Sequence, residues 1–373
     1  MSVKEYLFQK ASINRIPLSG TFELSPVCNF ECKMCYVRKT RNQLQIEGKK
    51  EYSTEDWLRL AEQCKKSGML YLLLTGGEPF IYPGFKELYE NLHKMGFILS
   101  INSNASMIDE KTIEWLKEFA PSRINITLYG ASEETYQRIC GNGSAFKRVV
   151  KAIRLLKEAG ISVVLNASMI PENAEDMKSI IQFGKDNDIP VRMGTYMFPP
   201  VRREKEETDS RFSPQQAGEM SVLKQYYLRQ PKEFEEYGTR MLNCIEGKEG
   251  KVENSWGQYG DIMTCRAGKS TFWISWEGKM TACGIMDFPI AVYPFEEEFF
   301  ECWKKLTKEV RSKSVLKGCN GCPKKEVCSP CAAIIHAETG DVNEKATYLC
   351  EMADATIECW KRMRGRGEET NES

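Results

Sequence analysis

Short apolar runs alternate with longer amphipathic segments through the first half of the chain. Residues 71–75 (Tyr-Leu-Leu-Leu-Thr) are a continuous apolar run with the length of a buried strand. A helix is predicted from about 54 to 68, with Thr54 as N-cap and Leu58, Ala61 and Cys64 on one face. Further strands are predicted at 20–25, 98–104, 123–129, 162–169 and 191–197, and further helices at 83–95, 109–119, 145–159 and 174–187. Such alternation predicts an α/β fold with a parallel sheet covered by helices.

This alternation ends near residue 197. A charged stretch, a helix at 214–229 and a Gly- and Glu-rich stretch follow, so 198–260 is interpreted as a bridging segment. A hairpin is then predicted within 272–282, turning at Glu277 and Gly278, with helices at 297–310 and 348–363. The predicted organisation is an N-terminal extension at 1–17, a core barrel at 18–197, the bridge, a small cysteine-rich α+β domain at 261–363 and a disordered polar tail at 364–373.

Charge and cysteine content narrow the class of protein. The 373 residues include 52 Lys and Arg against 52 Asp and Glu, which gives no indication of nucleic acid as a partner. No apolar run is long enough for a membrane span and the N-terminus is not a signal peptide, so a cytoplasmic protein is expected. Disulfides are rare in that compartment, so fifteen cysteines indicate metal or redox chemistry.

Three cysteines stand close together in the first predicted loop. Cys28, Cys32 and Cys35 have three and then two residues between them. Most [4Fe–4S] clusters are held by four thiolates, so three in one loop would leave one iron open to a small molecule. The alternative is three buried structural cysteines. The polar residues within the loop disfavour that alternative.

Polar groups gather where the predicted strands end. The 71–75 strand runs into Gly76, Gly77, Glu78 and Pro79, which alone would be an ordinary turn. Four further polar residues fall at or near the ends of later strands: Ser103, Asn104, Thr127 and Asn166. In such folds the chemistry lies at the C-terminal ends of the strands. For each residue the alternative is simple capping of a strand end.

The cysteine loop and the Gly-Gly-Glu-Pro turn together resemble the radical S-adenosylmethionine (radical SAM) superfamily. The resemblance implies a partial TIM-like (β/α)6 barrel, a [4Fe–4S] cluster on Cys28, Cys32 and Cys35, and S-adenosylmethionine on the open iron. It implies cleavage of that cofactor to a 5′-deoxyadenosyl radical that removes a hydrogen atom from a substrate. In this family an aromatic residue usually precedes the third cysteine, and here Met34 stands there with Tyr36 just after the cysteine.

The same resemblance implies contacts to S-adenosylmethionine. Gly76 and Gly77 would let the backbone approach the methionyl amino group, and Glu78 would fix the loop. The residues at the strand ends, Ser103, Asn104, Thr127 and Asn166, would contact the carboxylate and the ribose. Relatives often carry an arginine where Cys140 stands here, and Arg138 is the substitute in this chain.

Nine cysteines follow residue 260, and seven of them are candidate ligands: Cys265, Cys283, Cys319, Cys322, Cys328, Cys331 and Cys350. The 319–331 stretch has the pattern CxxCxxxxxCxxC, which could bind zinc, although zinc would leave Cys265, Cys283 and Cys350 without partners. The set resembles the SPASM extension of radical SAM enzymes, including Gly278 to Cys283, which implies two auxiliary [4Fe–4S] clusters and three in all. One would use Cys319, Cys322, Cys328 and Cys350, and the other Cys265, Cys283 and Cys331. Cys244 is the nearest candidate for a missing fourth ligand. Cys302 and Cys359 are interpreted as packing residues.

The resemblance favours a radical oxidoreductase that modifies a peptide or protein by crosslinking, thioether formation, epimerisation or oxidation. One alternative is a sulfatase-maturing enzyme. It is disfavoured because Gly284 stands where those enzymes carry an Asp that acts as the base. Others are a small-molecule radical enzyme and a non-catalytic iron–sulfur or zinc scaffold. Expected partners are a flavodoxin- or ferredoxin-like electron donor and a separate leader-peptide-binding protein. The bridge could replace that protein through Tyr226, Tyr227, Phe234 and Tyr237, unless these aromatics only pack its helices.

Overall fold

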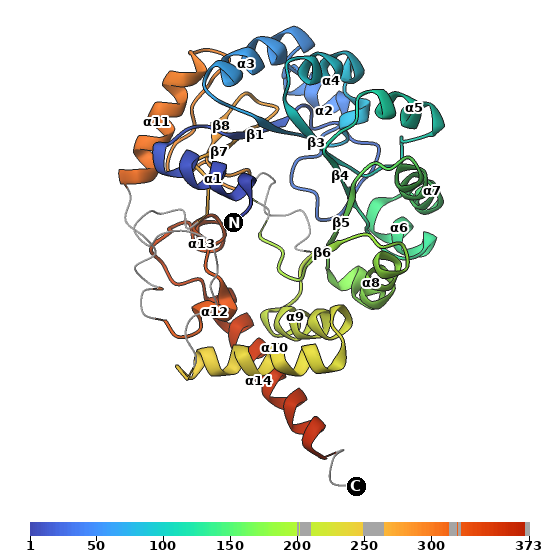
Figure 1. The fold of residues 1–373 in the computed structure, drawn as a ribbon, viewed down its shortest axis with the longest axis vertical. Helices are drawn as coiled ribbons and strands as arrows, with labels where there is room; N and C mark the ends of the chain where they lie inside the picture. The colour runs from blue at the N-terminus through green and yellow to red at the C-terminus, as the bar shows by residue number, and fades with distance from the viewer. Residues whose placement is uncertain (200, 202–209, 249–264, 313–318, 320–321, 370–373) are drawn as a thin grey trace.

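The described strands of the protein form one sheet. The computed structural model describes residues 1–199, 201, 210–248, 265–312, 319 and 322–369. Its strand order is β6-β5-β4-β3-β2-β1-β7-β8, and β1 to β6 are parallel (Figure 1). These six strands are β1 (Ser19–Glu23), β2 (Tyr71–Thr75), β3 (Ile98–Ser103), β4 (Arg123–Thr127), β5 (Val163–Ser168) and β6 (Val191–Gly194).

Helices cover the outer face of this curved sheet (Figure 1). They are α3 (Thr54–Lys66), α4 (Phe85–Lys94), α5 (Glu110–Glu118), α6 (Glu133–Cys140), α7 (Ala145–Glu158) and α8 (Met177–Asp186), with short 3-10 turns η1 (Pro79–Ile81) and η2 (Pro171–Asp176). The predicted partial (β/α)6 barrel is therefore confirmed. The N-cap of α3 is Ser53 rather than Thr54, because the Ser53 side chain accepts from the Asp56 amide in a capping box.

The hydrophobic core lies between the sheet and these helices. Phe22, Leu72, Leu74 and Ile101 are fully or almost fully buried on the helix side of their strands. The Phe22 ring lies 4.9 Å from the ring of Trp57 on α3. Each such side chain contributes about 1.5–3 kcal/mol through burial. The alternate positions of the same strands face the lumen of the barrel, because successive side chains of a strand point to opposite faces.

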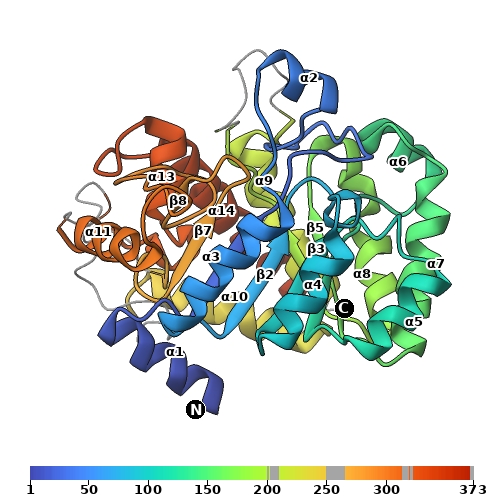
Figure 2. The same ribbon diagram turned by 90° about the horizontal axis from the view of Figure 1, so that it is seen from above.

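Two short helices lie at opposite ends of the barrel (Figure 2). The helix α2 (Arg41–Ile46) follows the cysteine loop at the C-terminal ends of the strands. The helix α1 (Val3–Asn14) lies at the other end, where Phe8 stacks on Tyr71 with 5.4 Å between ring centroids. The predicted N-terminal extension thus forms a helix that packs under the sheet.

The predicted hairpin joins the barrel sheet. β7 (Thr271–Ile274) pairs with β8 (Met280–Thr281), and the turn between them includes Gly278 at φ +82°. β7 also lies parallel to β1, with Ser19 opposite Thr271. The helix α11 (Phe299–Ser312) packs beside it, and its Trp303 indole donates to the Arg15 carbonyl at 2.6 Å. One sheet therefore crosses the predicted boundary at residue 260.

The remaining helices pack beside the open edge of the barrel (Figure 1). They are α9 (Pro214–Leu228), α10 (Pro231–Ile245), α12 (Lys325–Cys328), α13 (Ala332–Thr339) and α14 (Thr347–Glu369). A buried ion pair joins Arg211 to Glu338 on α13 at 2.8 Å, and the Tyr196 hydroxyl donates to the same carboxylate at 2.7 Å. The helix α14 runs to Glu369, inside the segment expected to be a disordered tail, because extending an existing helix adds a hydrogen bond for each residue that is ordered.

A glycine sets the closest approach of α9 to α14. A Cβ atom at Gly218 would lie 2.6 Å from the Met352 carbonyl oxygen and 2.8 Å from the Thr356 nitrogen. Both are backbone atoms of α14, so neither can rotate away. The spacing of the two helices therefore depends on the absence of a side chain at this position.

We predict that Gly218→Ala lowers the free energy of unfolding by about 1–3 kcal/mol, because the added methyl group forces the helices apart. Urea unfolding followed by circular dichroism measures the change. The matched control is Gly194→Ala, where the nearest atom to a new Cβ is 3.9 Å away. Equal unfolding midpoints for the two variants would contradict this account of the α9–α14 contact.

Candidate functional site

The first cysteine loop lies at the C-terminal end of β1. The Cys35 amide donates to the Cys32 carbonyl at 3.0 Å, which turns the loop back on itself. Backbone amides also point at two of the sulfur atoms, Phe30 N at 3.4 Å from Cys28 Sγ and Arg38 N at 3.3 Å from Cys35 Sγ. Amide donors of this kind stabilise thiolates and tune the clusters that thiolates hold.

The C-terminal end of α6 is hydrogen bonded to the backbone of the loop. The amides of Glu31 and Lys33 donate to the carbonyls of Cys140 and Ile139, at 2.9 and 3.1 Å. Cys140 itself is fully buried, and its thiol hydrogen bonds with Cys32, which raises the pKa of Cys32 well above the ordinary value. Where relatives often carry an arginine, this chain therefore places a thiol against a predicted cluster ligand.

The two glycines after β2 lie against the backbone of the cysteine loop. Gly77 N donates to Ser25 O at 2.8 Å, and Glu78 N donates to Val27 O at 3.0 Å. A Cβ atom would lie 2.4 Å from Ser25 O if added at Gly76, and 2.2 Å from Val27 O if added at Gly77. Gly76 also has φ +145°. The close approach that these glycines permit in this structure is to the loop, whereas the sequence interpretation assigned it to a cofactor.

Glu78 is a buried carboxylate that ties three segments together. It is 1% exposed and accepts from Ser103 Oγ at 2.8 Å, Asn104 N at 2.8 Å and Phe80 N at 3.2 Å. Burial raises the pKa of Glu78 to about 7, although the three donors each act to lower it. Asn104 continues the network, since its Nδ2 lies 2.9 Å from Asn29 Oδ1 and 3.7 Å from Cys28 Sγ. Ser103 and Asn104 thus connect β3 to the loop.

The other predicted cofactor contacts divide into two groups. Thr127 and Asn166 lie opposite each other at the ends of β4 and β5, half-buried and facing the same edge as the loop. Tyr36 packs edge-to-face on Phe198 at 5.9 Å and also lines the barrel lumen. The remaining residues serve the local fold: Met34 packs against the main core, Pro79 begins η1, and the Arg138 guanidinium donates to the Glu172 carbonyl at 2.7 and 2.9 Å.

The later cysteines gather in two places. Burial raises the pKa of Cys328 to about 12, and the nearby thiolates of Cys350, Cys319 and Cys322 raise it as well, so these four are neighbours. Cys331 is likewise a neighbour of Cys265, which lines the same cavity as Cys283. Cys244 lies on α10, which contacts the helices carrying Cys328 and Cys350. Within the described residues, no three such side chains come close enough together to hold one metal ion.

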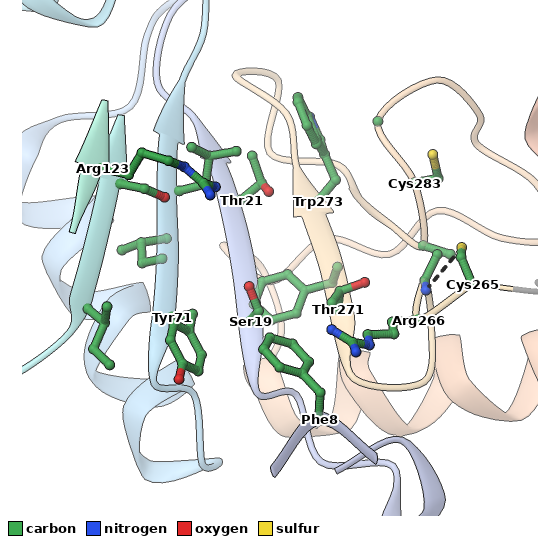
Figure 3. A pocket seen from close by; sticks show the side chains of 18 of the residues that line it. Phe8, Ser19, Thr21, Tyr71, Arg123, Cys265, Arg266, Thr271, Trp273 and Cys283 are labelled. Atoms are coloured by element: carbon green, nitrogen blue, oxygen red, sulfur yellow. Dashed lines mark hydrogen bonds between the residues drawn. The ribbon is translucent and has the colours of Figure 1, made fainter. Parts of the chain in front are cut away.

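A cavity of about 690 Å³ extends along the barrel lumen (Figure 3). Residues of the barrel strands line one side, among them Thr21, Ser100 and Arg123. Cys265 and Cys283 line the other side, beyond Trp273 on β7, and Gly284 also lines the cavity. The sequence interpretation missed the lumen residues. Their signal was the regular appearance of polar side chains at alternate positions of otherwise apolar strands.

Comparisons with known proteins identify the class. Residues 22–184 match the Radical SAM superfamily. The chain is 25% identical over 350 residues to an AdoMet-dependent heme synthase of Methanosarcina barkeri, which covers 90% of this chain and 97% of that protein. It is 25% identical over 167 residues to the sporulation killing factor maturation protein SkfB of Bacillus subtilis. That match covers 45% of this chain and 39% of SkfB. The chain thus spans under half of SkfB.

Solved structures share the fold. Streptococcus suis SuiB bound to precursor peptide SuiA has a TM-score of 0.64 at 18% identity, covering 92% of this chain and 78% of SuiB. The protein anSMEcpe with bound AdoMet has a TM-score of 0.67 at 17% identity, covering 96% and 100%. Residues 22–184 therefore form a Radical SAM domain, a domain type that carries a [4Fe–4S] cluster and S-adenosylmethionine, and the protein is an enzyme. No helix in the described part of the chain is long and apolar enough to cross a membrane.

We predict that Glu78→Gln lowers the free energy of unfolding by about 1–3 kcal/mol, because the amide NH2 replaces one carboxylate oxygen and faces at least one of the three donors. The matched control is Glu87→Gln, an exposed position on α4. Thermal unfolding at pH 8 measures both variants, at a pH above the value of about 7 to which the pKa of Glu78 is raised. A Glu78→Gln protein as stable as the control would show that the carboxylate does not hold the loop.

Proposed function

We propose that the protein is a radical SAM enzyme that modifies a peptide or protein substrate. The observation that carries this proposal is the lumen cavity, which is lined by Tyr36 from the first cysteine loop and by Cys265 and Cys283 from the predicted auxiliary site. A substrate in this cavity would lie between the radical-generating loop and the auxiliary cysteines. Such a position would favour reaction by holding the two partners together.

The first cysteine loop fits an iron–sulfur cluster. Cys28, Cys32 and Cys35 would hold it, and the amides of Phe30 and Arg38 already point at two of the sulfur atoms. When bound, the cluster supplies the electron that cleaves S-adenosylmethionine to methionine and a 5′-deoxyadenosyl radical. We propose that Tyr36, Thr127 and Asn166, which lie at or near the same edge of the sheet, contact S-adenosylmethionine. Glu78, Ser103 and Asn104 would act as positioning residues for the loop.

Two further clusters are proposed for the C-terminal cysteines. The neighbours Cys319, Cys322, Cys328 and Cys350 make a complete set of four thiolates. Cys265, Cys283 and Cys331 make a set of three. Because α10 contacts the helices of the first set, Cys244 is better placed toward that set than toward the second. We therefore propose that the second set leaves one iron open toward the lumen cavity, which Cys265 and Cys283 line.

The support for a peptide substrate comes from proteins of similar sequence or fold. SkfB is a maturation protein, and SuiB has been solved with its precursor peptide bound. The sulfatase-maturing alternative is less favoured. A Cβ atom at Gly284 would lie 2.6 Å from the Trp273 ring, so an Asp base could not stand there without displacing that indole.

A second candidate substrate is a tetrapyrrole. The match to the heme synthase extends over 90% of this chain, whereas the match to SkfB covers 45%. Identity of 25% over the full length favours a shared domain organisation and leaves the substrate open to test. Anaerobic incubation with an iron-free or iron-bound propionate-bearing porphyrin, followed by mass spectrometry, distinguishes this candidate from a peptide modification.

The bridge is a weaker candidate for peptide recognition than its composition indicated. Phe234 is buried, with its ring 4.6 Å from Trp360 on α14, and Tyr237 lies 5.8 Å from the same indole. Tyr226 packs on Phe234 and Tyr227 at 5.4 and 5.6 Å. Phe234 and Tyr237 therefore pack α10 against α14, whereas Tyr226, between α9 and α10, is 48% exposed. We propose that a separate protein supplies leader binding if the substrate has a leader, and that a flavodoxin- or ferredoxin-like protein supplies electrons.

We predict that Cys32→Ala abolishes the release of 5′-deoxyadenosine from S-adenosylmethionine in the presence of dithionite, since the loop then lacks a ligand. The iron held by the C-terminal cysteines is retained, because those cysteines lie in another part of the fold. Anaerobic reconstitution, iron analysis and chromatography of the nucleoside measure both effects. Cys64→Ala is the control, since Cys64 is buried in α3. Substantial 5′-deoxyadenosine from Cys32→Ala would refute the assignment.

We predict that Cys331→Ala loses the iron of one cubane, whereas Cys244→Ala keeps the iron content and the electron paramagnetic resonance spectrum of the wild type. The expectation follows from an auxiliary site with three protein ligands. A marked loss of iron or an altered spectrum in Cys244→Ala would show instead that Cys244 is the fourth ligand and that the site is closed.

A further inference from the structure

Five neighbouring strands each point one side chain into the lumen at the same level. This level lies near the N-terminal ends of the strands. The pairing of the strands places Trp273 opposite Thr21, Thr21 opposite Leu73, Leu73 opposite Ser100, and Ser100 opposite Arg123. All five line the same cavity. Arg123 is the only charged member, and Figure 3 shows its side chain extending across the lumen toward Thr21.

Arg123 has no ionic partner among the described residues. Its Nε atom is buried and makes no hydrogen bond in the described part of the chain. Burial lowers the pKa of Arg123, and the positive charge of Arg192 on β6 lowers it further. A partly buried cation without a counter-charge is energetically unfavourable. Other contacts of the fold must therefore offset the cost of holding the Arg123 side chain there. Such groups in a cavity are candidates for ligand binding.

The other charged residues of the cavity wall are also cations, although Arg266 lies near the Glu5 carboxylate on α1. The described residues that line it include Lys4, Arg123 and Arg266 and no carboxylate. The nearest carboxylate along β1 is Glu23, one layer higher. It already accepts from the Trp273 indole at 3.2 Å and from the Trp276 amide at 3.5 Å. Hydroxyl groups such as those of Thr21 and Ser100 add neutral donors, and apolar side chains such as Leu73 make up most of the remaining wall.

We propose that this cavity binds a carboxylate group of the substrate, with Arg123 as its charge partner. A guanidinium pairs with a carboxylate through two parallel hydrogen bonds. Both candidate substrates of the proposed function, a peptide and a tetrapyrrole, carry carboxylates and need no phosphate, which favours a carboxylate as the bound anion. Which molecule carries this carboxylate rests on the proposed function. A peptide would supply it from an acidic residue, and a tetrapyrrole would supply it from a propionate.

This carboxylate site is distinct from the site proposed for S-adenosylmethionine. Arg123 precedes Thr127 by four residues on β4, which is roughly 13 Å along a strand. A substrate anchored at Arg123 would therefore extend upward past the lumen toward Tyr36 and the cysteine loop. Arg123 would set the depth and orientation of the substrate and would not touch the reacting atoms, so it is a binding and positioning residue.

Two pairs of probes that differ in charge test the proposal on anaerobically reconstituted enzyme. The first pair is Nα-acetylglutamate amide and Nα-acetylglutamine amide, and the second is coproporphyrin III and its tetramethyl ester. Binding is measured by saturation-transfer nuclear magnetic resonance for the first pair and by absorbance titration for the second. We expect at least one acid to bind the wild type better than its neutral counterpart. Arg123→Gln should weaken the binding of that acid by about tenfold or more, and Arg123→Lys should weaken it less.

The pair that shows the charge preference also identifies whether the carboxylate comes from a peptide or from a tetrapyrrole. The control variant is Arg154→Gln, an exposed arginine on α7, which should bind every probe like the wild type. Arg123→Gln without ligand should unfold at the same temperature as the wild type or higher, because it removes an unpaired cation, so lost binding cannot be ascribed to misfolding.

Equal binding of acid and neutral probes in both pairs, or unchanged acid binding by Arg123→Gln, would overturn the carboxylate site. The proposed function is tested separately, because release of 5′-deoxyadenosine with dithionite needs no bound carboxylate. Arg123→Gln should retain that release and the affinity for S-adenosylmethionine. If Arg123→Gln cleaves S-adenosylmethionine normally but binds acid and neutral probes equally, the defect lies in the carboxylate site and not in the radical chemistry.

Discussion

The site depends on one contact between two backbones. The cysteine loop after β1 crosses the end of β2 so closely that Gly76 and Gly77 have no room for a Cβ atom. Two hydrogen bonds, to Ser25 O and Val27 O, fix the crossing. Glu78 then stabilises it from below through donors on β3 and η1. The position of the three cysteines follows from this crossing, because the loop is attached to the end of β2 before Cys28 and to the end of α6 after it.

The alternation of strands and helices could be predicted from the sequence because each signal is local. The apolar run at 71–75 gave the bounds of β2. The bounds of α4 and α7 agree within a few residues with their predicted ranges. The pairing of β7 with β1 could not be predicted, because Ser19 and Thr271 are far apart in sequence and nothing local specifies their register. The helix α6 was not among the predicted ranges because its eight residues make only about two turns, too few for a clear helical period.

The candidate site was predictable in its residue types and less so in its contacts. Cysteine spacing and the Gly-Gly-Glu-Pro turn identified the radical SAM domain, because such spacings follow the geometry of a cluster and of a tight turn. The role of Arg138 depends on where the η2 turn lies, since the guanidinium binds the Glu172 carbonyl. The contact of Cys140 with Cys32 depends on how α6 ends against the loop. Both are tertiary contacts that spacing does not encode.

The lumen can hold polar groups among its apolar side chains because of the way this barrel is stabilised. Side chains of Phe22, Leu74 and Ile101 bury their apolar surface against the outer helices, so the sheet does not need an apolar interior. The opposite face of the same strands is then free to carry Thr21, Ser100 and Arg123 around a cavity of about 690 Å³. A closed barrel with a packed interior would exclude these groups. Because the outer helices supply the stability, the lumen can retain a desolvated cation whose favourable partner is a ligand.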